Sequence, residues 1–358
     1  MRKKLVGMLT TATLLTMALA GNVQAAEIRS VGPDGEAAVD ASTIELTDEQ
    51  IEQVKEGGYT AAICLHYGGN DWSTSQQKGL EDTFGELGIE IVAVTDANFS
   101  AETQVSNIET VMAKKPDILV SIPTDATATA DAYKQAAAAG IKIVFMDQRA
   151  NGLEAGKDYV SVVSADNYGN GYASGTVLGD ALGGKGKVAM VYYDANFAPT
   201  NQRDEGFRDA MKNYPDIEIV TEQGFTDESG CAEQGDAILT QFPNIDGIYA
   251  SWDVPMEGVL SAVRAAGMEG KVTLACNDLG NNVAREIASG NIAGGGAQMP
   301  YDQGVAEAKL AALALLGEET PSYVAVPAET VTHENVLEAY TDVYHVETPD
   351  WLKEAYVD

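Results

Sequence analysis

Residues 158–175 read DYVSVVSADNYGNGYASG, and this stretch divides the chain into two halves. Tyr159–Ser164 is a short run of β-branched and apolar side chains, which predicts a strand. The strand runs into Ala165–Asn167 and then into the glycine-rich start of a helix. Strand–helix units lie on both sides of the stretch. We therefore interpret it as a crossing between two lobes, with a binding cleft beside it.

Apolar strands alternate with amphipathic helices throughout the first half. The expected strands are Tyr59–Leu65, Ile89–Thr95, Asp117–Ile122 and Ile141–Met146. Ser73 and Ser100 are predicted N-caps of the first two helices, and Gly88 and Gly140 end helices. This alternation is typical of a parallel sheet that is covered by helices on both faces.

The second half repeats this pattern and then returns to the first lobe. Its expected strands are Lys187–Tyr193, Ile217–Val220, Gly247–Trp252 and Val272–Cys276, with helices near Thr200–Asn213, Glu228–Gln241, Pro255–Ala266 and Gly280–Ala288. Ile292–Met299 is a returning strand, Tyr301–Leu316 is a long helix, and Val324–Pro327 is a third crossing. The predicted fold class is α/β: two Rossmann-like lobes with parallel sheets, joined by a three-strand hinge.

The expected organisation has five parts. Residues 1–25 form a signal peptide, and residues 26–58 form a leader on the surface of the first lobe, with one short helix capped by Thr47. The N-terminal lobe takes residues 59–165 plus 299–324, and the C-terminal lobe takes 166–298 plus 325–345. Residues 346–358 are a C-terminal tail. Length alone permits two lobes of ordinary domain size.

The first 25 residues have the three parts of a secretory signal. Arg2, Lys3 and Lys4 precede a short apolar core, and small side chains before Glu27 suit cleavage after Ala25. Asn22 stands where a lipid anchor would need cysteine, so the mature chain is expected to be periplasmic and without an anchor. Removing the signal leaves 19 basic against 54 acidic residues, a formal charge of −35. Such a charge repels phosphate backbones, which argues against a nucleic-acid partner.

Cysteine and histidine are too few for a disulfide scaffold or a metal centre. Cys64 and Cys276 lie within apolar strands, which predicts buried thiols. The three histidines have no metal-ligand spacing, and no cofactor motif is present. Glycines 169, 171 and 175 follow a strand but have one residue too many for a dinucleotide-binding turn. We expect a binding protein without a cofactor.

Polar and aromatic side chains recur directly after the predicted strands, at the ends that face the cleft. The candidate ligand-binding residues are His66, Asn70, Asp71, Trp72, Asp125, Asp147, Gln148, Asn196, Asn201, Arg203, Trp252, Asp253, Asp278 and Gln298. Carboxylates and amides together satisfy the hydroxyls of a polyhydroxylated molecule, and indole faces pack against its C–H groups. Asp and Asn after strands also cap helices, an alternative that applies most to Asp253.

An ordered series of short motifs resembles a known family. They are Ile122-Pro123-Thr124-Asp125, Phe145-Met146-Asp147, Ser164-Ala165-Asp166-Asn167, Asn201-Gln202-Arg203-Asp204-Glu205-Gly206-Phe207, Asn277-Asp278 and Ala297-Gln298-Met299-Pro300. Behind a signal peptide, this order resembles the type I periplasmic sugar-binding proteins, in the ribose-binding branch that serves ABC importers. The resemblance runs from about Tyr59 to about Asn335.

The resemblance implies roles for six of the candidates. It implies that Asn70 is an amide contact, Trp72 a stacking ring and His66 a polar contact, that Asp147 and Asp278 are hydroxyl acceptors, and that Gln298 is a hinge-region amide. Three departures make another aldose or a linear sugar alcohol as good an expectation as ribose. Gln148 and Asn201 replace arginines common in the ribose type, and Trp252 replaces an asparagine.

The expected partners follow from the same resemblance. They are a small sugar or polyol and a membrane ABC permease, and the protein is expected to be a monomer. A periplasmic sensor that presents its ligand to a chemotaxis or two-component receptor would have the same sequence features. A glycosidase needs two carboxylates that flank a bond, which the aspartates allow by residue type alone. A sugar-responsive repressor would begin with a DNA-binding helix-turn-helix, and this chain begins with a signal peptide.

Overall fold

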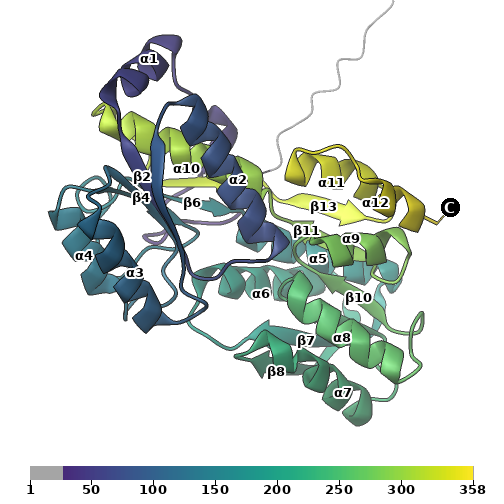
Figure 1. Ribbon diagram of the computed structural model, residues 1–358. Coiled ribbons are helices and arrows are strands. Elements are labelled where there is room, and N and C mark those ends of the chain that lie inside the picture. The colour runs from purple at the N-terminus through teal and green to yellow at the C-terminus, as the bar shows by residue number, and fades with distance from the viewer. Residues whose placement is uncertain (1–26, 358) are drawn as a thin grey trace, which may run out of the picture.

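The computed structural model describes residues 27–357, so the predicted signal peptide lies outside the described residues. The described chain forms two lobes, each built on one sheet with helices on both faces (Figure 1). None of the helices between residues 27 and 357 has the length and apolar character needed to cross a bilayer. The predicted α/β class with two lobes is confirmed.

The first lobe contains a seven-stranded, entirely parallel sheet. In spatial order its strands are β1 (Val39–Asp40), β12 (Tyr323–Val326), β6 (Ser161–Ala165), β5 (Lys142–Met146), β4 (Ile118–Ser121), β2 (Thr60–Leu65) and β3 (Glu90–Asp96). Five of these strands had been expected within one or two residues. Pairing of β12 with β6 carries the first sheet to Val326, two residues beyond the expected lobe boundary.

The second lobe contains a six-stranded sheet. Its order is β13 (Glu329–Thr332), β11 (Gly294–Ala297), β10 (Thr273–Cys276), β9 (Gly247–Ala250), β7 (Lys185–Tyr193) and β8 (Asp216–Phe225). The sheet is parallel except for β13, which runs antiparallel to β11. Strand β8 is longer than the four residues predicted for it, because it pairs along the whole of β7.

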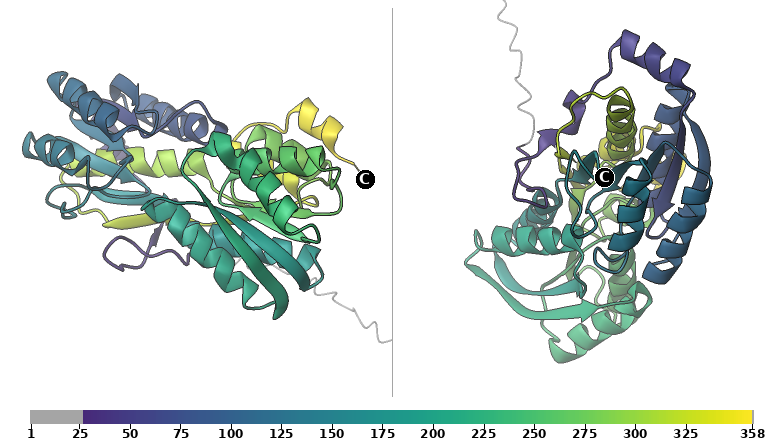
Figure 2. Two further views of the ribbon diagram at one scale, coloured as in Figure 1. Left: turned by 90° about the horizontal axis from the view of Figure 1, so that it is seen from below. Right: turned by 90° about the vertical axis from the view of Figure 1, so that its left-hand side faces the viewer.

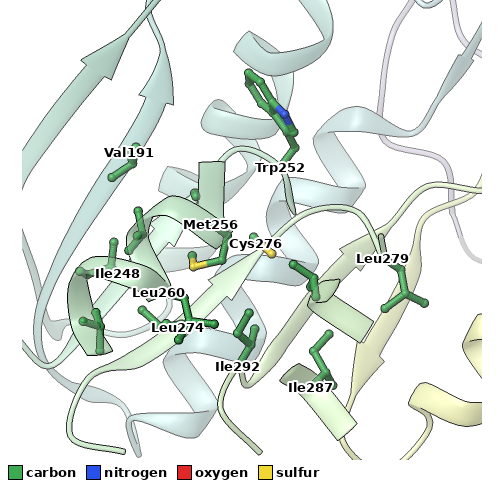
Figure 3. Packing of buried hydrophobic residues seen from close by; sticks show 14 of the residues in the cluster. Val191, Ile248, Trp252, Met256, Leu260, Leu274, Cys276, Leu279, Ile287 and Ile292 are labelled. Carbon is green, nitrogen blue, oxygen red and sulfur yellow. The ribbon is translucent and has the colours of Figure 1, made fainter. Parts of the chain in front are cut away.

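Helices cover both faces of each sheet and enclose the apolar cores. In the first lobe they are α1 (Asp48–Gly57), α2 (Asp71–Glu86), α3 (Ala101–Ala113), α4 (Ala130–Ala138) and α10 (Pro300–Leu315). In the second they are α5 (Asn167–Ala181), α6 (Ala198–Met211), α7 (Cys231–Gln241), α8 (Asp253–Ala265), α9 (Asn281–Ala288), α11 (Val336–Tyr344) and α12 (Asp350–Ala355). Figure 3 shows the larger core of the second lobe, where Met256 and Leu274 pack beside the buried thiol of Cys276.

The chain passes between the lobes at three places within residues 59–357. It crosses after β6 into α5, after β11 into α10, and between β12 and β13. These places agree with the crossings expected near Ala165, Gln298 and Val324–Pro327. The carboxyl ends of the parallel strands in both sheets therefore face a common junction, which is where α/β proteins place ligands.

The leader was expected to lie on the surface of the first lobe. In the structure it contacts both lobes. Its strand β1 pairs with β12 in the first sheet. Upstream of β1, the backbone N–H groups of Arg29 and Ser30 donate to the Asp166 carboxylate, and Gln202 Nε2 donates to the carbonyl of Val31. Figure 2 shows this segment, in purple, beside the junction of the two lobes. Strand β1 has only two residues and is flanked by polar residues in the sequence, so periodicity does not predict it.

Two of the three predicted helix caps are present. Thr47 and Ser100 accept hydrogen bonds from Gln50 N and Thr103 N. Ser73 is not a cap, because α2 begins two residues earlier and the side chain of Asn70 accepts from the backbone N–H of Ser73. Serine and asparagine are equally good N-caps, so composition alone does not choose between adjacent candidates.

The glycines after β6 bring two helices of the second lobe into backbone contact. A Cβ atom on Gly171 of α5 would overlap the carbonyl of Arg203 on α6, and one on Gly206 of α6 would overlap the carbonyl of Tyr168. The glycine spacing that imitates a nucleotide-binding turn is therefore used for close helix packing. This packing sets the position of Arg203 relative to α5.

We expect Gly171→Ala to lower the free energy of unfolding by about 1–3 kcal/mol, because the added methyl group must push α5 and α6 apart. Urea denaturation measures the effect. Gly85→Ala is the matched control, since a Cβ on Gly85 of α2 meets no other atom and alanine is the better helix former. Equal stability of the two variants would show that the α5–α6 contact relaxes without cost.

Candidate functional site

A cavity lies between the lobes at the carboxyl ends of the strands, with about 50 Å³ of free space in this closed arrangement. Both lobes contribute side chains to its wall: His66, Tyr67, Trp72, Phe99, Ile122 and Asp147 from the first, and Tyr193, Phe197, Pro199, Thr200, Arg203, Trp252, Asp278 and Gln298 from the second or the hinge. Half of the wall residues carry a ring system of Phe, Tyr, Trp or His.

The lobes touch each other around this cavity. The rings of His66 and Phe197 stack across the junction with centroids 5.6 Å apart. The carboxylate of Asp71 accepts from both the backbone N–H and the side-chain amide of Asn281, at 2.7 and 2.8 Å. Gln148 Oε1 accepts from the backbone N–H of Ala198 at 3.2 Å. The wall is therefore assembled from both lobes at once.

Asp147 offers one carboxylate oxygen to the cavity. Its Oδ1 atom accepts from Ser164 Oγ at 3.0 Å, from Ala165 N at 3.3 Å and from Gln303 Nε2 at 3.3 Å. No described residue donates to Oδ2. Burial raises the pKa of Asp147, while Arg203 and the three hydrogen bonds act in the opposite direction. Oδ2 remains as an acceptor for a bound molecule.

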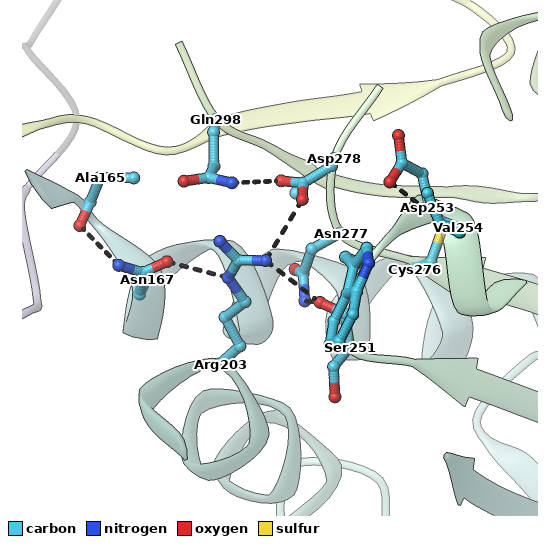
Figure 4. A network of polar contacts seen from close by, with 12 residues as sticks. Ala165, Asn167, Arg203, Ser251, Asp253, Val254, Cys276, Asn277, Asp278 and Gln298 are labelled. Atoms are coloured by element: carbon cyan, nitrogen blue, oxygen red, sulfur yellow. Dashed lines mark hydrogen bonds and ion pairs between the residues drawn. The ribbon is translucent and has the colours of Figure 1, made fainter. Parts of the chain in front are cut away.

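Arg203 is the centre of a buried polar network in the second lobe (Figure 4). Its Nε donates to Asn167 Oδ1 at 2.8 Å, and its Nη1 donates to the Ser251 carbonyl at 3.3 Å and to Asp278 Oδ2 at 3.2 Å. Burial alone would lower the pKa of Arg203, but the carboxylates of Asp278 and Asp147 raise it overall. The guanidinium is therefore charged, and Nη2 has no partner among residues 27–357.

Asp278 and Gln298 complete this network at the hinge. Gln298 Nε2 donates to Asp278 Oδ1 at 2.7 Å, so both oxygens of Asp278 have one donor each. Gln298 Oε1 is buried and has no partner within the described chain. Asp278 adopts a left-handed backbone conformation, with φ of 70°, as does Asp147 with φ of 54°. Such residues cluster at functional sites, where the surrounding structure holds them in place.

Two ring nitrogens of the first lobe are buried at the cavity without partners in the described part of the chain. They are His66 Nδ1 and Trp72 Nε1. Burial lowers the pKa of His66 from 6.5 to about 3, so the imidazole is neutral at physiological pH. Because buried polar groups in native proteins are nearly always hydrogen-bonded, these two atoms indicate a ligand that supplies the missing partners.

The structure brings seven of the fourteen predicted residues to the cavity: His66, Trp72, Asp147, Arg203, Trp252, Asp278 and Gln298. Asp253 lies next to it, buried behind Asp278, where its carboxylate accepts from Val254 N at 2.8 Å and from Gly280 N at 3.0 Å. Asp253 therefore organises the backbone beside the site, but it is not the N-cap expected as the alternative, because α8 begins at Asp253 itself and its N-cap is Trp252. Burial first, and then the charge of Asp278, raises the pKa of Asp253.

The other six predicted residues do not line the cavity. Asn70 is the N-cap of α2 and also donates to Tyr67 Oη, and Asp125 Oδ1 accepts from the backbone N–H groups of Thr127 and Ala128. Asp71 and Gln148 form the contacts between the lobes described above. Asn196 and Asn201 are exposed. Local groups, the opposite lobe or solvent therefore take up these six polar side chains.

Four aromatic wall residues were not predicted: Tyr67, Phe99, Tyr193 and Phe197. Tyr67 stacks on Phe99 at 4.2 Å, and Tyr193 meets Trp252 edge to face at 5.6 Å. Tyr67 and Phe197 stand in the same strand-end stretches as His66 and Asn196, so the positional signal was available. Choosing polar residues within these stretches selected Asn196 over its neighbour Phe197.

The side chains of the wall suit a neutral ligand that carries several hydroxyl groups. Carboxylate oxygens accept from hydroxyl groups, guanidinium and amide groups donate to them, and ring faces cover apolar C–H surfaces. Within residues 27–357 no group of three or more His, Cys, Asp or Glu side chains is arranged to hold a metal ion. Cys64, Cys231 and Cys276 are free and buried, as the sequence predicts for the first and last of them.

Comparison with known proteins agrees with this chemistry. The family model of the periplasmic binding protein domain matches residues 61–319. A ribose import binding protein of Salmonella typhimurium is 24% identical over 272 residues, which cover 76% of this chain and 90% of the relative. A D-ribose/D-allose-binding protein of Pseudomonas aeruginosa is 29% identical over 273 residues, covering 73% of this chain and 83% of the relative.

Solved structures show the same fold. An ABC transporter solute-binding protein of Actinobacillus succinogenes with bound D-allose superimposes with a TM-score of 0.72 and 29% identity, covering 78% of this chain and 99% of its own. One from Agrobacterium vitis bound with α-D-tagatopyranose has a TM-score of 0.74 and 26% identity, covering 80% and 98%.

Proposed function

The chain belongs to the periplasmic binding protein family, and from this premise we propose that it is an exported solute-binding protein for a small neutral sugar or sugar alcohol. The lobes close on the ligand, and the closed protein delivers it to an ABC importer. Members of this family bind solutes without chemical conversion, so the protein is not an enzyme. The ligands named for the similar proteins above, ribose, allose and tagatose, support an aldose, a ketose or a related polyol.

The observation that carries the proposal is the set of unpaired polar atoms in one ring-lined cavity. Asp147 Oδ2, His66 Nδ1, Trp72 Nε1 and Gln298 Oε1 all lack a protein partner within residues 27–357 and belong to residues of the same wall. Leaving such groups unpaired costs about 1–3 kcal/mol each, so a molecule that carries several hydroxyl groups gains affinity by pairing them. Closure then follows from ligand contacts to both lobes, since a ligand shifts a conformational equilibrium by its differential affinity.

The location and partner belong to the same proposal. The similar proteins include import binding proteins and ABC transporter components, which favours delivery to a membrane permease over presentation to a sensory receptor. We place the mature protein in the periplasm, after cleavage behind Ala25 and without a lipid anchor, as a monomer. Of the residues that depart from the ribose type, Trp252 lines the cavity, whereas Gln148 lies outside it and accepts a hydrogen bond from Ala198 of the opposite lobe.

A thermal-shift screen of residues 26–358 tests the function. The panel contains pentoses, hexoses and sugar alcohols, with nucleosides and amino acids as controls. A ligand at a hundredfold excess over Kd stabilises the folded state by about 2.7 kcal/mol, which raises the melting temperature measurably. A response confined to sugars or polyols supports the proposal and identifies the ligand. A response only to nucleosides or amino acids would retain the fold and overturn the sugar assignment.

Replacement of Asp147 tests the site. We expect Asp147→Ala to weaken the affinity for the sugar found in the screen by tenfold or more, on the order of 1.5–3 kcal/mol, because a charge-assisted acceptor is lost. Asp147→Asn keeps an acceptor for Ser164 and Gln303 and separates the loss of charge from local disruption. Asp125→Ala is the control, since Asp125 also follows a strand of the first lobe but caps a turn outside the cavity. Titration calorimetry that finds equal affinities for the Asp147 and Asp125 variants would remove Asp147 from the site.

A further inference from the structure

A row of buried polar side chains extends from Asp147 into the first lobe, away from the cavity. Gln303 and Glu307 of α10 and Gln76 of α2 are each fully buried. Gln303 Nε2 donates to Asp147 Oδ1 at 3.3 Å and to the Val163 carbonyl at 3.0 Å. Gln76 Nε2 donates to Glu307 Oε1 at 2.7 Å. These residues lie behind the carboxylate that faces the cavity.

Three atoms of this row are buried without a partner in the described chain: Gln303 Oε1, Glu307 Oε2 and Gln76 Oε1. All three are acceptors as long as Glu307 is ionised. Both hydrogens of the Gln303 amide are already used. No cation among residues 27–357 pairs with Glu307. An ionised carboxylate with a single donor would be very unfavourable at such depth.

We infer that Glu307 carries a proton on Oε2, donates it to Gln303 Oε1, and so acts as a positioning residue for Asp147. Gln303 and Glu307 lie four residues apart on α10, which places their side chains next to each other on the helix surface. The hydrogen bond pairs two of the three unpartnered atoms at once. It requires one proton on Glu307.

The proton supports the observed orientation of the Gln303 amide, whose NH₂ group donates to Asp147 Oδ1 and to the Val163 carbonyl. With Oε1 held by Glu307, the NH₂ group faces Asp147 Oδ1. The reversed amide would place its carbonyl against the Asp147 carboxylate, which is repulsive. Oδ1 is thereby occupied, and Oδ2 stays directed to the cavity. The inference rests on the proposed function only for its effect on ligand affinity, since the arrangement itself exists without a ligand.

The charged groups around Glu307 and Asp147 favour this assignment. Burial is the main cause that raises the pKa of Glu307, and the charge of Asp147 raises it further, while the hydrogen bond that Gln76 donates lowers it. Asp147 faces Arg203 from α6, together with Ser164 and the backbone N–H of Ala165 at the end of β6. None of these groups changes when Glu307 is replaced.

Infrared spectroscopy of the ligand-free protein tests for the proton. The difference spectrum of wild type minus Glu307→Gln at pH 8 should contain the carbonyl band of a protonated carboxylic acid. Glu86→Gln, which removes an exposed glutamate of α2, is the control and should show only the loss of carboxylate bands. Carboxylate bands alone in the Glu307 difference would overturn the inference.

The positioning role is tested by the titration of Asp147, followed in the same ligand-free protein by difference against Asp147→Asn. Glu307→Met should raise the pKa of Asp147, because Gln303 is no longer held as a donor. Glu307→Gln retains a hydrogen-bond donor at this position and should return the pKa of Asp147 to its wild-type value. A buried anion at position 307 predicts the opposite sign, because its removal relieves repulsion and lowers the pKa of Asp147. Gln303→Leu should also raise the pKa of Asp147, and this variant replaces Glu307→Met in the test if Glu307→Met does not fold.

D-ribose and D-allose serve as probes of the functional consequence. We expect Glu307→Met to weaken binding of whichever sugar the wild type binds by about 2- to 10-fold, with recovery in Glu307→Gln. Unchanged affinity in Glu307→Met would overturn the positioning role. If neither sugar binds the wild type, the sugar assignment loses support, while the two infrared measurements still decide the inference.

Discussion

Arg203→Met is expected to abolish ligand binding and to lower the free energy of unfolding by about 3–5 kcal/mol. Removing one partner of a buried ion pair leaves the other charge uncompensated, and Asp278 is such a partner. The substitution also frees Asn167 Oδ1 and the Ser251 carbonyl, which accept from the same guanidinium. Urea denaturation and titration calorimetry measure the two effects on the same protein.

Arg208→Met is the matched control for Arg203→Met. Arg208 lies on the same helix and pairs with Glu222 at 2.7 Å, but both side chains are 38% exposed. Exposed ion pairs contribute about 0–1 kcal/mol, so this variant should remain close to wild type and retain ligand affinity. An Arg203→Met protein that binds within threefold of wild type would show that the guanidinium organises the wall without contributing to affinity. Lysine is not a conservative replacement here, because it cannot reach three acceptors with a planar fork.

Asp204→Asn is expected to stabilise the protein by about 2–4 kcal/mol at pH 8 and by much less at pH 4. Burial raises the pKa of Asp204 from 3.8 to about 7, against the hydrogen bond from Ser251 and the charges of Arg208 and Arg203. Between these two values the unfolded chain has lost the proton and the folded protein keeps it. Each pH unit in this window therefore lowers the stability of the wild type by about 1.4 kcal/mol.

The sign of this dependence distinguishes Asp204 from a carboxylate in a favourable ion pair. A paired carboxylate stabilises the protein as pH rises. The charge of Asp204 instead destabilises the folded protein increasingly up to about pH 7, and above this pH the destabilisation stays constant. Urea midpoints of wild type and Asp204→Asn at pH 4, 5, 6, 7 and 8 should therefore diverge and then run parallel. Glu205→Gln, which removes the exposed neighbour on α6, controls for the loss of one negative charge. A constant difference at all five pH values would contradict the prediction.

Local periodicity was sufficient for the two-lobed α/β fold. Apolar runs such as Ile141–Met146 and the helical spacing between Ser100 and Gly140 are repeated in both halves, and each repeat needs only a few adjacent residues to be recognised. The position of the cleft followed as well, because parallel strands all end at one edge of a sheet. The short strand β1 escaped prediction, since two residues have no period.

Half of the predicted site residues line the cavity, and one cause explains why the others lie outside it. Loops after strands have no periodicity, so the sequence shows which stretch is near the cleft but not which of its side chains points into it. Asn70 and Asp125 were available as ligand contacts by residue type, and the structure uses them to satisfy backbone N–H groups at helix or turn starts. After β7, the rings of Tyr193 and Phe197 line the cavity, whereas the predicted Asn196 does not.

The sequence by itself determined the lobes, the crossings and the strand ends that carry the site, because these depend on side-chain patterns over a few neighbouring residues. Only the tertiary structure decided which atoms lack partners. Gln76 meets Glu307 across 231 residues, Gln303 meets Asp147 across 156, and Arg203 meets Asp278 across 75. Hydrogen bonds over such separations are set by the packing of α2, α5, α6 and α10 on their sheets, and that packing is not encoded in any local pattern.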